Sequence, residues 1–190
     1  MRRRWTLAVL GLIVAMLAQA AVAGEPTDHL KGEIDALYES AQKSGDATAS
    51  AGRAIVDRMF DWTAMAQAAL GEHWKARTPT EREQFTQLFS DLFARAYLAR
   101  VHLVDAKTFQ YLGETVDGDR ATVKTKVFTK RGSAIAVDYL LRNNPSRPWQ
   151  VHDVRVETIS LIDNYRVQFD SVIVKSSYAD LVARLRNLPK

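Results

Sequence analysis

Cysteine is absent from the 190 residues, and only four histidines are present. Without cysteine the chain has no disulfide framework, no thiol nucleophile and no attachment point for a thioether-linked lipid. The histidines, His29, His73, His102 and His152, are far apart in sequence, and no two of them have the i, i+4 spacing that places two metal ligands on one helical face. We therefore expect no metal site and no cofactor.

Sequence motifs of the common enzyme classes are missing as well. The chain contains no Gly-rich phosphate loop and no G-x-S-x-G motif, so nucleotide binding and acyl transfer have no support. Asp138 and Tyr139 could act as a proton-transfer pair in a cone-like fold, but we expect a solvated or salt-bridged Asp138. Adjacent residues of a strand point to opposite faces, so His152 and Asp153 cannot readily touch. We predict that the protein is not an enzyme; a small-molecule enzyme on a cone-like α+β fold, with Asp138 or His152 as the base, is the alternative.

The N-terminus carries the features of an export signal. Three arginines follow the initiator methionine, an apolar run extends from Trp5 to Ala18, and small residues continue to Ala23. This pattern is typical of a secretory signal peptide, and the run is shorter than the roughly 20 residues that cross a bilayer. We expect cleavage near Ala23, which leaves residues 24–190 as a single domain in the periplasm.

The net charge of the exported chain is close to zero. The whole chain has 26 basic and 22 acidic residues, a formal charge of +4, but residues 1–23 hold three arginines and no acid. Residues 24–190 therefore have 23 basic and 22 acidic residues, a charge of +1. The high isoelectric point belongs largely to the leader, so we expect no nucleic-acid partner.

The strongest helix signal begins at Thr78. Thr78 and Glu81 form a capping-box pattern around Pro79, which suits the first position of a helix. Aromatic residues and leucines then recur three and four apart as far as Tyr97, which predicts a long helix with one wide apolar face. Further helices are expected over 30–41, 51–60 and 62–70 and after Ser160 and Ser177, with Asp61, Ser160 and Ser177 as N-caps and Gly71 as a stop.

The periodicity of apolar residues changes from 3.6 to 2 after about Val104, which indicates strands. Short turn sequences at 117–119 and 131–132 favour antiparallel connections between neighbouring strands. The four expected strands cover residues 109–112, 120–130, 133–142 and 149–158. The predicted fold class is α+β, with helices packed on one face of a curled four-stranded antiparallel sheet.

Several segments resemble one family, in order along nearly the whole exported chain. They include F-D-W at 60–62, T-E-R-E-Q-F at 80–85, W-Q-V-H-D-V at 149–154 and S-L-I-D-N-Y-R-V-Q-F at 160–169. These segments are similar to the MlaC-type toluene-tolerance proteins, which are periplasmic lipid-binding components of an outer-membrane asymmetry system; the hopanoid-associated HpnM branch is also similar. Thr158 departs from the pattern, because a glycine is expected between the last strand and the helix.

The resemblance implies a soluble carrier that holds a lipid in an apolar cavity and has no catalytic residues. The implied ligand is a phospholipid, or a hopanoid in the HpnM branch. The implied partners are an inner-membrane ABC transporter complex with a lipid-binding MCE subunit and an outer-membrane lipoprotein complex. The carrier is expected to shuttle lipid between the two.

The apolar faces of the helices and of the sheet are the expected walls of this cavity. Periodicity alone does not distinguish a filled core from a hollow one, so a periplasmic chaperone or adaptor with a filled core is a third hypothesis. Lipid headgroups are expected to stay in water at the mouth, and Arg100 and Arg142 to be solvated surface residues. The residues predicted to contact the acyl chains are Met65, Phe89, Leu92, Phe93, Val123, Val127, Ile135, Val137, Tyr139, Val154, Tyr165 and Phe169.

Overall fold

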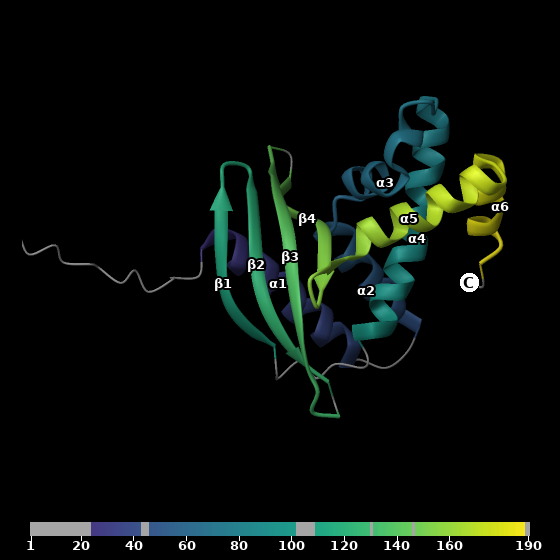
Figure 1. Ribbon diagram of the computed structural model, residues 1–190. Coiled ribbons are helices and arrows are strands. Elements are labelled where there is room, and N and C mark those ends of the chain that lie inside the picture. The colour runs from purple at the N-terminus through teal and green to yellow at the C-terminus, as the bar shows by residue number, and fades with distance from the viewer. Residues whose placement is uncertain (1–23, 43–45, 102–108, 130, 146, 189–190) are drawn as a thin grey trace, which may run out of the picture.

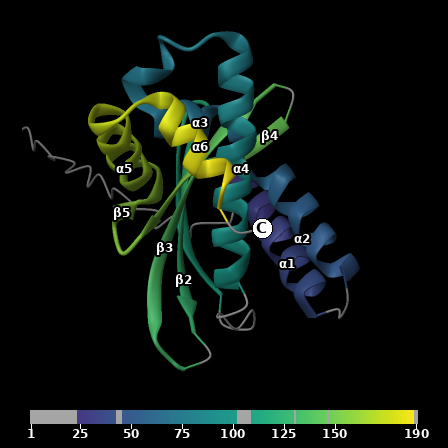
Figure 2. The same ribbon diagram turned by 90° about the vertical axis from the view of Figure 1, so that its right-hand side faces the viewer.

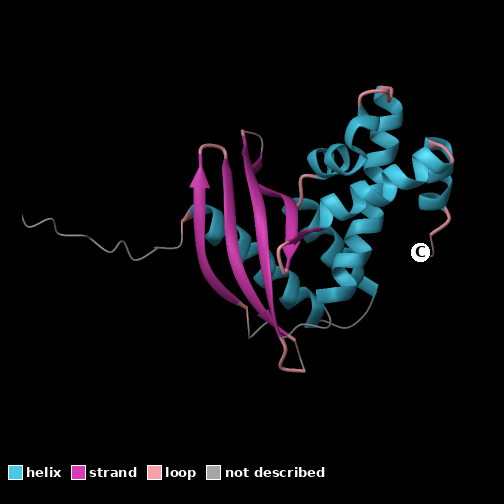
Figure 3. Ribbon diagram, in the orientation of Figure 1, coloured by secondary structure: helices cyan, strands magenta, loops and turns pink. Residues whose placement is uncertain are grey.

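The computed structural model describes residues 24–42, 46–101, 109–129, 131–145 and 147–188. Within these ranges a twisted antiparallel sheet lies against a group of helices (Figures 1 and 3). The α+β class expected from the sequence is thus confirmed. The predicted signal peptide and His102 lie outside the described residues.

The helices come before and after the sheet in the chain. α4 stands between the pair formed by α1 and α2 and the pair formed by α5 and α6 (Figure 2). α1 contacts β1, β2 and β4, whereas α3 and α5 pack together and against β4. The helices are α1 (Glu25–Gln42), α2 (Asp46–Met59), α3 (Trp62–Leu70), the 3₁₀ turn η1 (Gly71–Trp74), α4 (Pro79–Val101), α5 (Leu161–Lys175) and α6 (Tyr178–Arg186).

The sheet has five strands among the described residues, in the order β1-β2-β3-β4-β5, and each pair of neighbours is antiparallel. The strands are β1 (Gln110–Asp117), β2 (Arg120–Phe128), β3 (Ala134–Asn144), β4 (Arg147–Val156) and β5 (Ile159–Ser160). The prediction of four strands was therefore wrong by one. β5 is only two residues long, too short to carry a period-2 pattern, and it forms because the chain turns back on the end of β4.

The first strand is longer than the sequence pattern predicts. A register shift between Tyr111 and Gly113 breaks the alternation of side chains between the two faces. Gly113 has a φ of 136°, a backbone conformation that residues with a side chain rarely adopt. Beyond this bulge Glu114 faces α1, where its carboxylate accepts a hydrogen bond from the backbone N–H of Thr27 at 2.9 Å. The irregular register therefore explains why the pattern after Leu112 does not read as a strand.

The local helix signals in the sequence are confirmed. The Asp61 carboxylate accepts the Ala64 N–H at 3.0 Å, and the Glu81 carboxylate accepts the Thr78 N–H at 2.8 Å. Ser160 caps α5 through the Asp163 N–H at 2.9 Å, and Ser177 caps α6 through the Asp180 N–H at 3.0 Å. Each of these bonds satisfies a backbone donor that a helix end leaves free.

Two segments far apart in the sequence meet where α2 ends beside β4. Phe60 and Val151 form an isolated parallel bridge, and the N–H of Asp61 donates to the Val151 carbonyl at 2.9 Å. The side-chain amide of Gln150 donates to the carbonyls of Arg58 and Phe60, each at 3.2 Å. These bonds anchor the end of α2 to the sheet and so fix the position of α3.

Candidate functional site

An apolar cavity of about 310 Å³ lies between the sheet and the C-terminal part of α4. Its walls come from β2, β3 and β4, which present inward-facing side chains, and from α1, α4 and the first residue of α5. The exposed side chain of Arg100 and the half-buried Thr129 mark its opening. The residues that line it are Tyr38, Tyr97, Arg100, Val101, Phe109, Val127, Thr129, Ile135, Val137, Tyr139, Val154, Val156 and Leu161.

Five of the twelve residues predicted to contact acyl chains line this cavity. They are Val127, Ile135, Val137, Tyr139 and Val154. All five lie on the inner face of the sheet, where strand alternation places every second side chain toward the helices. The inner face of the sheet thus forms one wall of the cavity.

The other seven predicted residues are not among those that line the cavity. Met65, Phe89, Phe93, Val123 and Phe169 are buried in the packed core, and Leu92 and Tyr165 are partly buried against it. The Phe89 ring lies 5.5 Å from the Tyr165 ring and 6.1 Å from the Phe169 ring, both edge-on. The N-terminal part of the apolar face of α4 is thus covered by α5, and its C-terminal part faces the cavity.

Several cavity residues were absent from the predicted set. Tyr97 lies at the end of the apolar stripe that the sequence shows along α4, and Tyr38 lies on the stripe of α1. The helical period shows which side of each helix is apolar, but it does not show which turn of that helix faces the cavity. Phe109, Val156 and Leu161 lie at the ends of elements, where periodicity is weakest.

Two tyrosine hydroxyls meet inside the cavity. The Tyr97 and Tyr139 oxygens are 3.2 Å apart, and the Tyr139 side chain is almost fully buried. Burial raises the pKa of Tyr97 to about 12, and burial together with the nearby Tyr97 raises the pKa of Tyr139 well above its usual value. Both groups therefore stay protonated and uncharged at neutral pH.

The residues considered as catalytic bases do not form a catalytic pair. Tyr139 points into the cavity, so its strand neighbour Asp138 points to the other face of the sheet. Burial lowers the pKa of His152; the charges of Asp153 and Asp61 oppose this shift, whereas those of Arg142 and Arg120 add to it. The Asp153 carboxylate is engaged by the backbone N–H groups of Val154 and Ile162, at 2.8 and 3.2 Å.

A second pocket, of about 410 Å³, lies near the start of β2 and the end of β3, away from the apolar cavity, and is mostly polar. Arg120 and Arg142 face each other across these strands, and His152 and Arg166 also line the pocket. Arg142 lies 3.5 Å from the exposed Asp119. Arg142 is thus a partly exposed surface residue outside the apolar cavity, as the sequence predicts.

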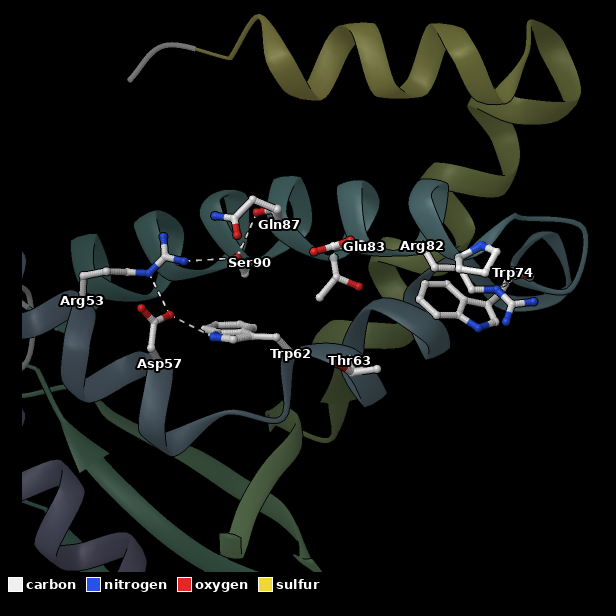
Figure 4. A pocket seen from close by; sticks show the side chains of 11 residues that line it. Arg53, Asp57, Trp62, Thr63, Trp74, Arg82, Glu83, Gln87 and Ser90 are labelled. Atoms are coloured by element: carbon white, nitrogen blue, oxygen red, sulfur yellow. Dashed lines mark hydrogen bonds and ion pairs between the residues drawn. The ribbon is translucent and has the colours of Figure 1, made fainter. Parts of the chain in front are cut away.

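A larger groove between α2, α3 and α4 is crossed by charged side chains (Figure 4). Arg53 pairs with Asp57 at 2.8 Å and with Asp91 at 2.6 Å. Burial by itself lowers the pKa of Arg53, but the hydrogen bonds and charges of the two aspartates outweigh this effect and raise the pKa above its usual value. The Trp62 indole also donates to Asp57 at 2.9 Å. Filling this groove with an acyl chain would desolvate these charges, so the groove does not suit an apolar ligand.

Two further properties concern the described part of the chain as a whole. Within it, no three histidine, aspartate or glutamate side chains come together in a way that could hold a metal ion. None of its helices is both long and apolar enough to cross a membrane.

Comparison with known proteins identifies a family and shows a likeness to a solved structure. The model of the MlaC protein family matches residues 28–187. The solved structure of the phospholipid-binding protein from Ralstonia solanacearum, in complex with a phospholipid, is 24% identical in sequence and superposes with a TM-score of 0.69. The match covers 86% of this chain and 96% of that one. At this identity the likeness establishes a shared fold.

Proposed function

The chain belongs to the MlaC family, and from this premise we propose that it is a phospholipid carrier that holds acyl chains in the apolar cavity between the sheet and α4. The cavity is the observation that carries the proposal. Valine, isoleucine and tyrosine side chains from three strands and two helices surround it, and Arg100 is the single charged side chain among the described residues that line it.

The energetics of lipid transfer make such an enclosure necessary. Each methylene group that leaves an apolar environment for water costs about 0.8 kcal/mol, so an unescorted two-chain lipid cannot cross an aqueous space at a useful rate. A cavity lined by hydrocarbon offers the chains nearly the same environment as a bilayer does. Loading and unloading can then be close to balanced, and any directional energy comes from a partner.

The cellular setting follows from the family and from the N-terminal pattern. We propose that residues 1–23 are removed near Ala23 and that residues 24–190 act as one soluble domain in the periplasm. The carrier would exchange lipid with an inner-membrane ABC transporter complex that has a lipid-binding MCE subunit and with an outer-membrane lipoprotein complex. In this scheme the protein catalyses no reaction, because its task is binding and release.

The phospholipid in the Ralstonia solanacearum structure favours a phospholipid ligand over a hopanoid. Native mass spectrometry of the exported protein purified from cells tests this directly. We expect a mass increment equal to a diacyl phospholipid, identified by fragmentation after release. A hopanoid mass would assign the chain to the HpnM type of carrier, and a protein that carries no lipid and takes none from phospholipid vesicles would refute the proposal.

A further inference from the structure

The strand register orders the wall of the cavity from its opening to its inner end. Thr129, next to the end of β2, lies at the opening. Along β3, Ile135 is the lining residue nearest to this opening, Val137 follows, and Tyr139 is the last. The four residues from Ile135 to Tyr139 span about 14 Å of extended strand. Tyr139 thus lies at the inner end of the cavity, behind a wall of hydrocarbon.

A tyrosine from the helices meets Tyr139 at this inner end. Tyr97 of α4 places its hydroxyl oxygen 3.2 Å from that of Tyr139. The Tyr139 side chain is 3% exposed, and the lining beside the pair includes Val137 and Val154, whose side chains offer no hydrogen bonds. The cavity therefore ends in a polar pair that an apolar wall separates from water.

The hydrogen bond between the two tyrosines uses only one of their two protons. Each hydroxyl can donate one hydrogen bond and accept others. Within the described residues, the bond to the other tyrosine is the one hydrogen bond found for each hydroxyl. Whichever tyrosine donates, one O–H remains without an acceptor, and an unmet buried donor is costly. A ligand oxygen that reached the pair would remove this cost.

The nearby inner face of the sheet supplies no acceptor for this proton. Thr125 pairs with Tyr111 of β1 and with Val137 of β3, so the three side chains share this face. The Thr125 hydroxyl already donates to the Val137 carbonyl at 2.6 Å. The buried Tyr111 hydroxyl has no hydrogen-bond partner in the part of the chain that the structure describes. This region thus contains more hydroxyl groups than hydrogen bonds.

Both hydroxyls of the pair keep their protons over the whole physiological pH range. Burial raises the pKa of Tyr97 to about 12 and raises the pKa of Tyr139 well above its usual value. The pair therefore carries no charge, and it fits a neutral group that can both accept and donate a hydrogen bond.

The depth of the pair determines which part of a lipid can reach it. A headgroup that stays in water at the opening keeps its phosphate and its ester oxygens far from Tyr139, and only atoms of the acyl chain extend to the inner end. A plain chain has no oxygen there, whereas a chain that carries a hydroxyl group has one. Inside a bilayer this chain hydroxyl has no partner, so transfer to the tyrosine pair satisfies both the ligand and the protein.

We propose that the Tyr97 and Tyr139 hydroxyls bind a hydroxyl group carried on the acyl chain of the ligand, and so favour hydroxylated chains over plain chains of the same length. This assignment rests on the proposed function, because it requires acyl chains in the cavity. It concerns specificity, since the chains still supply most of the binding energy.

A competition between matched lipids tests the assignment. The delipidated exported protein is incubated with vesicles that contain equal amounts of two phosphatidylglycerols of the same chain length, one plain and one with a single chain hydroxyl. Native mass spectrometry then counts protein bound to each, because the extra oxygen separates the two masses. The competition is repeated with the hydroxyl at successive positions along the chain. The wild type is expected to favour the hydroxylated lipid by about 3- to 10-fold, the value of one neutral hydrogen bond, at one depth only.

Removal of the tyrosine hydroxyls gives the second arm of the experiment. Tyr97→Phe combined with Tyr139→Phe keeps both rings and should bring the ratio close to one at every position. Tyr165→Phe, which removes a hydroxyl from a ring outside the lining of the cavity, should leave the preference unchanged. Each variant is first checked for a native circular dichroism spectrum, and the position series of the wild type tests the assignment without any variant.

The possible outcomes separate this inference from the function on which it rests. A wild type that binds plain and hydroxylated lipids equally at every position overturns the tyrosine assignment and leaves the carrier function intact. A preference that is the same at all positions, or that survives in the double variant, also overturns it. A wild type that takes up neither lipid overturns the carrier function and the assignment together.

Discussion

The carboxylate of Asp153 in β4 accepts a hydrogen bond from the backbone N–H of Ile162 in the first turn of α5, at 3.2 Å. The same oxygen accepts the Val154 N–H at 2.8 Å, and Asp153 itself is buried. A single side chain thus holds the last full strand and the following helix at a fixed angle. Because Leu161, next to Ile162, lines the cavity, this bond also positions part of the proposed binding site.

Replacement of Asp153 by alanine should therefore destabilise the protein. It leaves buried N–H donors without an acceptor, which costs about 1–3 kcal/mol. Urea denaturation followed by circular dichroism measures the change in the free energy of unfolding. Asp138→Asn on the other face of the sheet is the control, and we expect it to lie within about 0.5 kcal/mol of wild type. Equal stability of the two variants would contradict the role given to Asp153.

Thr158 occupies a backbone conformation that glycine adopts more easily. Its φ is 74°, and that of the preceding Glu157 is 49°. A left-handed conformation costs a side-chain-bearing residue about 1–2 kcal/mol, whereas glycine loses about 0.5–1 kcal/mol of extra entropy on folding. Thr158→Gly should thus raise the free energy of unfolding, by up to about 1 kcal/mol.

A threonine in regular strand conformation provides the control for this change. Thr122 lies within β2, and Thr122→Gly should lower stability instead. Thermal unfolding of the two variants side by side distinguishes the outcomes. A loss of stability in both would mean that the turn at Thr158 carries no strain.

Glu81 should give the first turn of α4 a dependence on pH. The N–H and hydroxyl of Thr78 hydrogen-bond its carboxylate and lower the pKa of Glu81 from its usual 4.5. A pKa lowered in the folded state stabilises the protein above the unfolded value, and this contribution is lost as the pH falls through the folded value. The melting-temperature advantage of wild type over Glu81→Gln should therefore shrink as the pH falls from about 5 to about 3. A difference that stays constant over this range would contradict the prediction.

The alternative of a catalytic base can be tested through Asp138 and His152. Neither has a catalytic partner within the described residues, since Asp138 points away from the cavity and Asp153 binds backbone groups. Asp138→Asn and His152→Ala should each leave the lipid recovered per folded protein within a few-fold of wild type. A folded, lipid-loaded variant that lost all function in a cellular assay would point back to catalysis.

The sequence predicts those parts of the fold that depend on neighbouring residues. The caps at Asp61, Ser160 and Ser177 and the capping box at Thr78 are local hydrogen bonds, and all are present. The inner face of the sheet is equally local, because strand alternation alone determines which side chains share a face. The bulge after Tyr111 and the two-residue β5 depend on how a strand pairs with its neighbour and not on alternation within the strand, so the pattern does not show them.

The position of the cavity along α4 depends on tertiary packing and could not be predicted. Phe89 and Tyr97 share one apolar stripe and look equivalent in sequence. In the structure, Phe89 is covered by Tyr165 and Phe169 from α5, whereas Tyr97, two turns further on, faces the cavity. β4 and the hydrogen bond of Asp153 to Ile162 determine where α5 crosses α4. These residues lie far from α4 in the chain. Periodicity shows that a face is buried, but not what covers it.

The claim that the apolar cavity holds acyl chains is tested most directly by the phospholipid recovered per folded protein for Val137→Trp against Arg142→Ala. Val137 lines the cavity, so a tryptophan there occupies the space that the chains need, whereas Arg142 lies in the separate polar pocket. Circular dichroism and size exclusion establish that each variant is folded, with Ile135→Trp as a second variant that fills the cavity. We predict that the tryptophan variants lose most of their lipid and that Arg142→Ala stays within a few-fold of wild type. An Arg142→Ala protein that emerges empty while Val137→Trp remains fully loaded would contradict the account.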